Sequence, residues 1–222
     1  MKTKNAKSFI ISAGLLIAFI LFTLLVIFID VKPIGPQESS VGFATVNEWV
    51  HNSVGVNMTL YTITDWASFL TLPIMLGFAM LGLCQFIKRR SLFKVDSSIL
   101  VLGGFYIIVL ACYLFFECNI VNYRPILING LLEASYPSST TMLVMCVMPT
   151  AMMQFSCFIK NSKARNIVNA FCGIFTGLMV MGRLVSGVHW FTDILGGALL
   201  SSALVMLYFS ANKLIGSKKS DQ

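Results

Sequence analysis

One short stretch near the end of the chain, RLVSGVHWFTD, carries three side chains that can act together on an anion. Arg183 supplies a cation, His189 an imidazole and Asp193 a carboxylate, although apolar runs lie on both sides. Because His189 and Asp193 are four residues apart, a helix would place them on one face. The carboxylate can then bond one ring nitrogen, fix the tautomer and leave the other nitrogen free. This arrangement is typical of a nucleophile or a general base.

Two further segments carry polar groups that favour anion binding. Arg124 precedes a proline, which disfavours helix and predicts an extended loop. Ser138, Ser139 and Thr140 are predicted at the start of a helix, where free backbone N–H groups and hydroxyls bind anions. Guanidinium groups from Arg124 and Arg183 beside a helix N-terminus are typical of a phosphate site.

Six apolar segments, each near the roughly 20 residues that a bilayer requires, must position these side chains. The chain is 57% hydrophobic and only 11% charged, whereas charged residues make up about a quarter of an ordinary soluble domain. We therefore expect an all-α integral membrane protein, a bundle of six transmembrane helices that forms one domain over residues 1–222. The predicted spans are approximately 8–29, 66–87, 97–116, 140–159, 166–181 and 190–210.

The distribution of basic residues predicts the orientation. Thirteen of the sixteen Lys and Arg residues lie at the ends of the chain or in loops on one side of the predicted bundle. Only Lys32, Arg124 and Arg183 lie on the other side. The positive-inside rule then predicts that both termini are cytoplasmic. The basic charge contacts lipid headgroups, so a nucleic-acid partner has no support.

The outer loop between the first two spans predicts a helix on the membrane surface. Phe43, Val46, Val50 and Val54 recur at helical spacing, as in an amphipathic helix at an interface. His51 lies in the same segment, and we interpret it as a solvated or interfacial imidazole.

The topology brings all of the polar motifs to the outer face. Glu117 ends the third span, Glu133 precedes the fourth, and His189 opens the sixth. Taken singly, each is typical of a side chain that reaches the interface, and a lone histidine is more often structural. Ionisable groups gathered at one membrane face are instead candidates for function. The sequence therefore predicts one site built from four helix ends.

No pattern in the chain predicts a metal or a cofactor. Five of the six cysteines lie well inside apolar runs, and no C-x-x-C pair or His/Cys cluster has metal-ligand spacing. We expect neither a metal site nor a bound cofactor.

Two glycine patterns predict close helix packing in lipid. These are Gly173-x3-Gly177 in the fifth span and Gly196-Gly197 in the sixth.

These motifs resemble those of the type 2 phosphatidic acid phosphatases, a family of lipid phosphatases within a superfamily that includes the vanadium haloperoxidases. The family carries three blocks: Lys-x6-Arg-Pro, Pro-Ser-Gly-His and Ser-Arg-x5-His-x3-Asp. In this chain the corresponding stretches are Glu117-x6-Arg124-Pro125, Pro137-Ser138-Ser139-Thr140 and Gly182-Arg183-x5-His189-x3-Asp193.

The resemblance implies a role for each matching residue. His189 would attack phosphorus and form a phosphohistidine, and Asp193 would orient it. Arg124, Arg183 and the region of Ser138 would hold the phosphoryl oxygens, without a metal. The resemblance also implies a bacterial plasma membrane, with the site facing outward.

Three positions depart from the family blocks. Glu117 replaces a lysine, Thr140 replaces the histidine that protonates the leaving oxygen, and Gly182 replaces a serine. General acid catalysis contributes about 10²–10⁴-fold and matters most for a poor leaving group. A diphosphate expels a phosphate, whose second pKa is about 6, so we expect a preference for a lipid diphosphate such as a polyprenyl diphosphate. Alternatively, Glu117, Glu133 or His51 supplies the proton.

Two classes of function remain open. The first is a lipid-phosphate phosphatase or phosphotransferase that uses His189, and the second is a catalytically impaired relative that binds a lipid phosphate or a partner protein. The paired imidazole and carboxylate favour the enzyme, because a binding protein does not require them. A transporter is disfavoured, since no charged residue is predicted in the middle of a span. The pattern does not predict an oligomeric state.

Overall fold

The computed structural model describes residues 2–220, with side chains described for residues 6–215, and the described residues form helices and loops without an extended strand. The α-helices are α1 (Lys2–Phe28), α2 (Ala44–Val54), α3 (Met58–Ser68), α4 (Thr71–Arg89), α5 (Ser97–Cys118), α6 (Ser139–Phe158), α7 (Ser162–Val185) and α8 (Phe191–Ser220). Two short 3-10 helices are η1 (Pro36–Glu38) and η2 (Leu92–Lys94).

Six helical segments of the described chain are long and apolar enough to cross a membrane, which confirms the predicted fold class. The second segment differs most from its prediction, because α3 and α4 together run from Met58 to Arg89. Because the second span was predicted to begin at residue 66, the first turns of α3 were expected to lie in a loop. Asn57 caps this helix, and its side-chain oxygen accepts a hydrogen bond from the backbone N–H of Leu60 at 2.9 Å.

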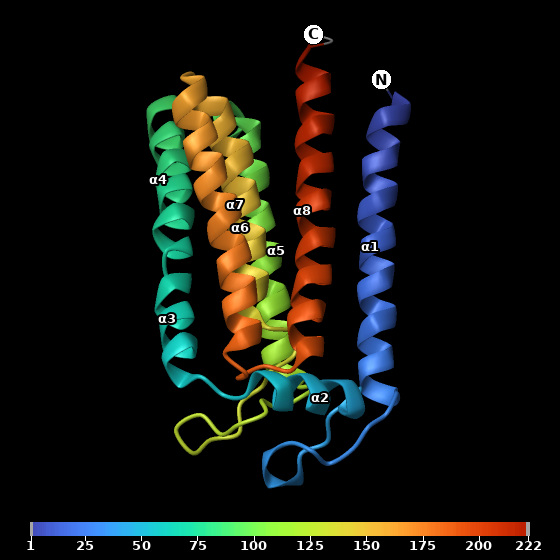
Figure 1. The fold of residues 1–222 in the computed structure, drawn as a ribbon. Helices are drawn as coiled ribbons and strands as arrows, with labels where there is room; N and C mark the ends of the chain where they lie inside the picture. The colour runs from blue at the N-terminus through green and yellow to red at the C-terminus, as the bar shows by residue number, and fades with distance from the viewer. Residues whose placement is uncertain (1, 221–222) are drawn as a thin grey trace.

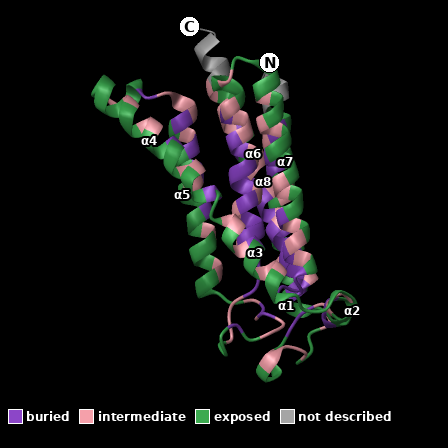
Figure 2. Ribbon diagram, turned by 60° about the vertical axis from the view of Figure 1, so that its left-hand side comes forward, coloured by how far each residue is buried: buried purple, intermediate pink, exposed green. Residues whose placement is uncertain are grey.

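The long helices run side by side, and the two ends of the chain lie at the same end of the bundle (Figure 1). The short helix α2 lies across the opposite end, beside the loops. Helix α1 packs against α8, and α6 packs against both α7 and α8. Burial is concentrated along α6 and α8 (Figure 2). In α6 and α8, half of the residues in the most apolar stretch are buried. In the corresponding stretch of every other span, fewer than a quarter of the residues are buried.

The predicted helix of the outer loop is α2, and it turns a polar residue toward the bundle. Val46 and Trp49 are exposed, whereas Asn47 is buried. The Asn47 amide donates to the Thr192 hydroxyl at 2.9 Å, and the Thr192 backbone N–H donates to the Asn47 side-chain oxygen at 3.2 Å. Because Thr192 lies in the first turn of α8, α2 fixes the start of that helix.

The two glycine patterns have different environments. Gly196 lies against the ring of Tyr136, where an added Cβ would be 2.5 Å from the nearest ring carbon. A Cβ added at Gly197 would be 3.0 Å from the Ser138 carbonyl oxygen. The prediction of close packing is confirmed there. At Gly173 and Gly177 an added Cβ would meet no atom of another helix within 4 Å. The prediction for that pair is wrong within this chain.

Candidate functional site

Arg124 lies in the irregular hairpin between α5 and α6. The hairpin turns at Asn129 and Gly130, which both have positive φ, as a tight two-residue turn requires. Arg124 and Glu133 face each other across it, and the Arg124 backbone N–H donates to the Glu133 carbonyl at 3.0 Å. Their side chains form an ion pair, with 3.2 Å between Arg124 Nε and Glu133 Oε2. Arg124 is nevertheless largely buried.

Arg183 lies in the last turn of α7 and is only 1% exposed. Its guanidinium group faces α3, where it pairs with Asp65 at 3.6 Å. It also lies 3.5 Å from both the Tyr61 carbonyl oxygen and the Thr64 hydroxyl. The first turns of α3, which were expected to lie in a loop, therefore hold this arginine.

The ring of Tyr61 contacts both arginines. The guanidinium carbon of Arg183 lies 4.7 Å from the ring centroid, and that of Arg124 lies 5.6 Å from it. A cation near an aromatic ring gains about 0.5–2 kcal/mol, depending on its solvation. Tyr61 thus holds two like charges in one small region.

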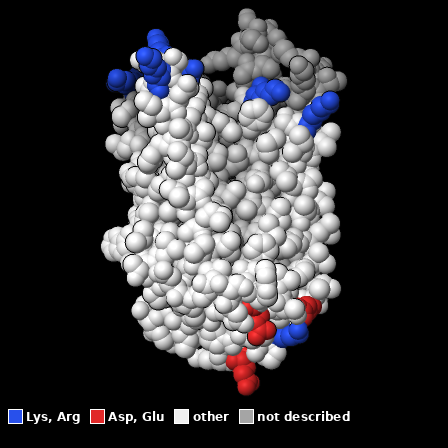
Figure 3. Space-filling model, viewed as in Figure 1, with Lys and Arg blue, Asp and Glu red and all other residues white. Residues whose placement is uncertain are grey.

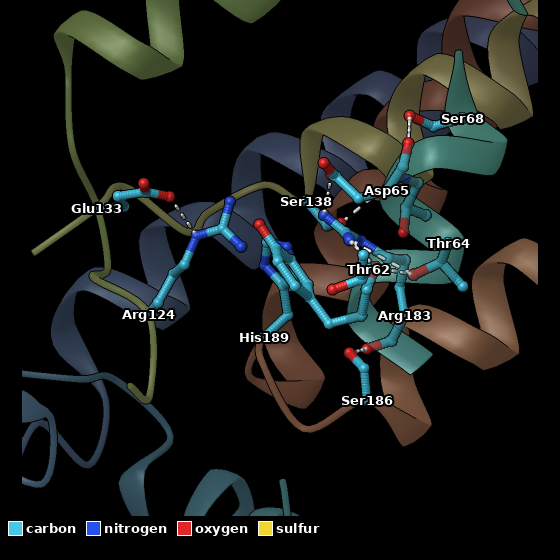
Figure 4. Close-up of polar contacts among 12 residues, drawn as sticks. Thr62, Thr64, Asp65, Ser68, Arg124, Glu133, Ser138, Arg183, Ser186 and His189 are labelled. Atoms are coloured by element: carbon cyan, nitrogen blue, oxygen red, sulfur yellow. Dashed lines mark hydrogen bonds and ion pairs between the residues drawn. The ribbon is translucent and has the colours of Figure 1, made fainter. Parts of the chain in front are cut away.

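His189 lies in the tight turn between α7 and α8. Gly187 adopts φ of +66°, and an added Cβ there would be 1.9 Å from the Gly55 carbonyl oxygen. The turn is also fixed by a 2.9 Å hydrogen bond from the Asn57 N–H to the Ser186 carbonyl. As predicted, the imidazole and both predicted arginines meet at one end of the bundle, and Figure 4 shows Arg124 and Arg183 on either side of His189.

The contact between His189 and Asp193 differs from its prediction. His189 precedes α8 instead of lying on it, and its Nδ1 is 3.7 Å from Asp193 Oδ2, too far for a hydrogen bond. Ser135 lies between them, with its Oγ 3.1 Å from His189 Nδ1 and in a short hydrogen bond to Asp193 Oδ2. Asp193 also accepts from the Trp190 backbone N–H at 2.8 Å, as a carboxylate in the first helical turn can.

Several polar atoms at this site are buried without a hydrogen-bond partner among the described residues. They are His189 Nε2, Arg183 Nε and Arg124 Nη1. Arg124 Nε also lacks a hydrogen bond, but it is ion-paired with Glu133. The guanidinium atoms are N–H donors, and Nε2 of a neutral imidazole can be an acceptor or a nucleophile. Buried polar groups of native proteins nearly always have a partner, so each unpaired group requires an explanation.

The surroundings of His189 favour the neutral imidazole. Burial, together with the positive charges of Arg124 and Arg183, lowers the pKa of His189 well below its usual value of 6.5. A neutral ring is required for attack through nitrogen, because the protonated ring has no free lone pair.

Ser138, Ser139 and Thr140 lie at the start of α6, as predicted, but the polar groups of Ser138 already have partners within the protein. Ser138 is the N-cap, and its Oγ accepts a hydrogen bond from the Thr141 N–H at 3.4 Å. Its backbone N–H donates to the Asp193 carbonyl at 3.0 Å and so joins α6 to α8. Ser139 and Thr140 begin the helix, where backbone N–H groups have no partner within the helix. Thr140 lines an apolar groove.

The two predicted acids occupy different places. Glu133 is engaged by Arg124. Glu117, at the end of α5, is exposed and lines a small cavity that also contacts His189, Tyr113 and Ser135. This cavity of about 10 Å³ has room for roughly one water molecule. His51, the third possible donor, lies with its ring 5.4 Å from that of Trp190.

The described residues contain no group of three or more His, Cys, Asp or Glu side chains placed to hold a metal ion.

The PAP2 superfamily model matches residues 71–215, well over half of the chain. The chain belongs to the PAP2 superfamily. A search of curated proteins found no match. Among solved structures, the chain is similar to a transmembrane PAP2 type phosphatidylglycerolphosphate phosphatase from Bacillus subtilis, with a TM-score of 0.61 and 20% identity. The similarity covers 92% of this chain and 96% of the other. At this identity it shows that the two proteins share a fold.

Sequence reasoning missed two residues of this PAP2 site. Ser135 lies two residues before the second family block, and Tyr61 lies on a helix that precedes the matched region. Neither residue type is unusual in a membrane protein, so composition gave no signal. An available signal for Tyr61 was Asn57, a good N-cap residue that indicates an earlier helix start.

Proposed function

We propose that this PAP2 protein is a lipid-phosphate phosphohydrolase or phosphotransferase in which His189 attacks phosphorus. The observation that carries the proposal is the set of unpaired buried atoms: His189 Nε2 beside guanidinium N–H groups of Arg124 and Arg183. A phosphoryl group would give these donors their partners and put an electrophilic phosphorus near the imidazole. The family relationship supports the same chemistry.

The proposed reaction has two steps. Nε2 of His189 forms a bond to phosphorus while the bond to the leaving oxygen breaks, and the electron pair departs with that oxygen. The arginines stabilise the negative charge on the phosphoryl oxygens. A water molecule or another hydroxyl compound then attacks phosphorus, the N–P bond breaks, and its electron pair returns to Nε2. The attacking hydroxyl loses its proton to the released phosphate or to solvent.

An apolar groove supports a lipid substrate. It has a volume of about 320 Å³ and lies among α4, α5 and α6. Tyr113, Ser139 and Met142 line both this groove and the small cavity at His189. A hydrocarbon chain in the groove would place its headgroup at the cavity. A phosphoryl group is larger than one water molecule, so its entry requires Tyr113 or Glu117 to change rotamer.

We further propose that the preferred substrate is a lipid diphosphate, such as a polyprenyl diphosphate. Thr140 stands where the family has a histidine acid, and a threonine hydroxyl does not donate a proton near neutral pH. A monoester expels an alkoxide, whose conjugate acid resembles water with a pKa of about 15.7. A diphosphate expels a phosphate with a second pKa of about 6, so this reaction depends least on an acid. If an acid is used, Glu117 is better placed than Glu133, because Arg124 engages Glu133.

The substrate preference can be tested with purified protein in vesicles that contain either a polyprenyl diphosphate or phosphatidic acid at equal surface density. We expect faster phosphate release from the diphosphate, and release from neither lipid by His189→Ala. A preference for the monoester would contradict the proposed leaving group. Full activity of His189→Ala would contradict the proposed nucleophile.

We also propose that the site faces outward from a bacterial plasma membrane. Lys and Arg side chains gather at the end of the bundle that carries the termini, whereas acidic side chains gather at the opposite end (Figure 3). Basic loops favour the cytoplasm. The hairpin with Arg124 and the turn with His189 lie at the end opposite the termini.

The second candidate is a binding protein that holds a lipid phosphate without turnover. The observation that favours it is the loss of both the lysine and the histidine of the family blocks, at Glu117 and Thr140. This candidate predicts saturable binding of vesicles with a lipid phosphate, no phosphate release, and unchanged binding by His189→Ala.

A further inference from the structure

Ser135 lies in the space between the imidazole and the carboxylate of the site. It precedes Tyr136-Pro137 at the end of the hairpin and is 3% exposed. Its backbone is held by a 2.9 Å hydrogen bond from its own N–H to the Asn122 carbonyl. Its Oγ contacts both His189 Nδ1 and Asp193 Oδ2. No family block used above includes this residue.

The direction of these hydrogen bonds follows from counting protons. Asp193 is surrounded by donors: the Trp190 backbone N–H at 2.8 Å, the Asn122 amide at 3.5 Å, and the Ser135 hydroxyl. Asp193 accepts from each of these groups, so the single hydroxyl proton of Ser135 points to Asp193. The Ser135 Oγ then accepts a hydrogen bond from His189 Nδ1, and the Ser135 backbone carbonyl is a second acceptor for the same ring. His189 consequently carries its proton on Nδ1 and presents a lone pair on Nε2.

The geometry points to Ser135 as a positioning residue that connects Asp193 to His189 and selects the nucleophilic tautomer of the imidazole. This inference rests on the proposed function, because it assigns a role within the same site. In the family pattern the carboxylate orients the histidine, whereas in this chain the 3.7 Å separation makes the hydroxyl the connecting group.

Ser135 also contributes while the ring carries positive charge. As Nε2 bonds to phosphorus, the imidazole becomes cationic and keeps its proton on Nδ1. The hydrogen bond to Ser135 Oγ then strengthens, since its donor is charged. No proton moves through the hydroxyl, and Asp193 stabilises the charge through the dipole of the O–H group.

The tautomer can be measured without any turnover. The chain has two histidines, His51 and His189, so ¹⁵N-histidine spectra of the full chain in detergent contain two imidazoles, and His51→Gln assigns them. We expect the Nδ1–H form of His189 in the wild type and in Ser135→Thr. In Ser135→Ala we expect a shift toward the Nε2–H form. An unchanged tautomer in Ser135→Ala, or the Nε2–H form in the wild type, would overturn the inference.

Kinetics give the second readout. Ser135→Ala should lower kcat by about 10- to 100-fold, as expected for one lost hydrogen bond to a charged group, and KM should change little. Ser135→Thr, which keeps the hydroxyl, should recover part of the loss. The matched control is Ser201→Ala, since Ser201 is also buried but donates to the Gly197 and Met142 carbonyls instead of to Asp193. If Ser201→Ala lowered kcat as much as Ser135→Ala does, the specific role of Ser135 would be overturned.

The two proposals fail in different ways. Full phosphate release by His189→Ala would end the proposed function, whatever the tautomer. An inactive His189→Ala beside a fully active Ser135→Ala with unchanged spectra would overturn only the role of Ser135.

Discussion

On one side of the site, His189, Ser135 and Asp193 are buried and joined by hydrogen bonds. On the other side, Glu117 is exposed and Thr140 lines an apolar groove. His189 and Asp193 belong to the family block that this chain keeps almost unchanged, whereas Glu117 and Thr140 stand at altered positions of the other two blocks. A buried charge or imidazole requires defined partners, because an unpaired polar group in a low-dielectric interior is strongly destabilising.

From the difference between the two sides we infer which step of the proposed reaction the site supports. In the proposed function the buried side attacks phosphorus, and its neutral imidazole beside two cations supports that role. The altered side has no side chain equivalent to the family's acid. This difference is the basis of our proposal that the preferred leaving group departs without a proton.

The largest effect is expected from removing a cation on the buried side. Arg183→Ala or Arg124→Ala should lower kcat/KM for a polyprenyl diphosphate by about 10²–10³-fold, as when one preorganised donor to a developing oxyanion is lost. Phosphate release from vesicles measures this effect. The control is Arg89→Ala, which removes a half-exposed ion pair with Asp96 at the other end of the bundle. Equal losses in all three variants would contradict a local role, and thermal unfolding would then identify a folding defect.

A smaller gain is expected from restoring the altered side. Glu117→Lys with Thr140→His should raise phosphate release from phosphatidic acid by about 10- to 100-fold, at the low end of what a general acid supplies. Release from the diphosphate should change much less. The measured quantity is the ratio of the two rates, with each single variant alongside the double variant. A constant ratio would show that the missing acid does not set substrate preference.

Tyr61 should have a moderate effect, since its ring holds both arginines. Tyr61→Ala should raise KM by about 2- to 30-fold, which corresponds to the usual range of a cation–aromatic contact. Tyr61→Phe keeps the ring and should behave like the wild type. A loss in Tyr61→Phe as large as in Tyr61→Ala would assign the effect to the hydroxyl group instead.

The smallest expected effect concerns pH. The pKa of His189 is lowered by burial and by both arginines, so the neutral, active ring persists below pH 6.5 and the acid limb of kcat/KM lies lower still. Arg124→Gln removes one positive charge and should move this limb to higher pH, whereas Arg124→Lys should leave it in place. A limb that does not move in Arg124→Gln would contradict the electrostatic coupling.

The same depressed pKa affects stability. Below pH 6.5 the unfolded chain binds a proton on this histidine that the folded chain excludes, so this contribution to stability falls as the pH falls.

The sequence predicted the long helices because apolar length is a direct physical requirement of the bilayer. It also predicted that Arg124, Arg183, His189 and Asp193 meet, since topology places their segments at one face. The start of α3 was missed because Met58–Asp65 is mixed in polarity, and the contacts of Arg183 with it appear only in the folded chain.

The side-chain contacts within the site could not be predicted from the spacing of residues in the sequence. The spacing of four from His189 to Asp193 suggested a shared helical face, but the helix begins only at Phe191. The gap that results is filled by Ser135, from a distant part of the chain. Gly196 and Gly173 show the same limit, because only the three-dimensional neighbours decide which glycine is packed.

The most direct test of the account is to trap the covalent intermediate. Wild-type protein in vesicles would be mixed briefly with a polyprenyl diphosphate carrying ³²P in its terminal phosphate and quenched in alkaline detergent, which preserves phosphohistidine. The account predicts one labelled peptide that contains His189 and no label in His189→Ala. Label on another residue, or rapid phosphate release by His189→Ala, would contradict it.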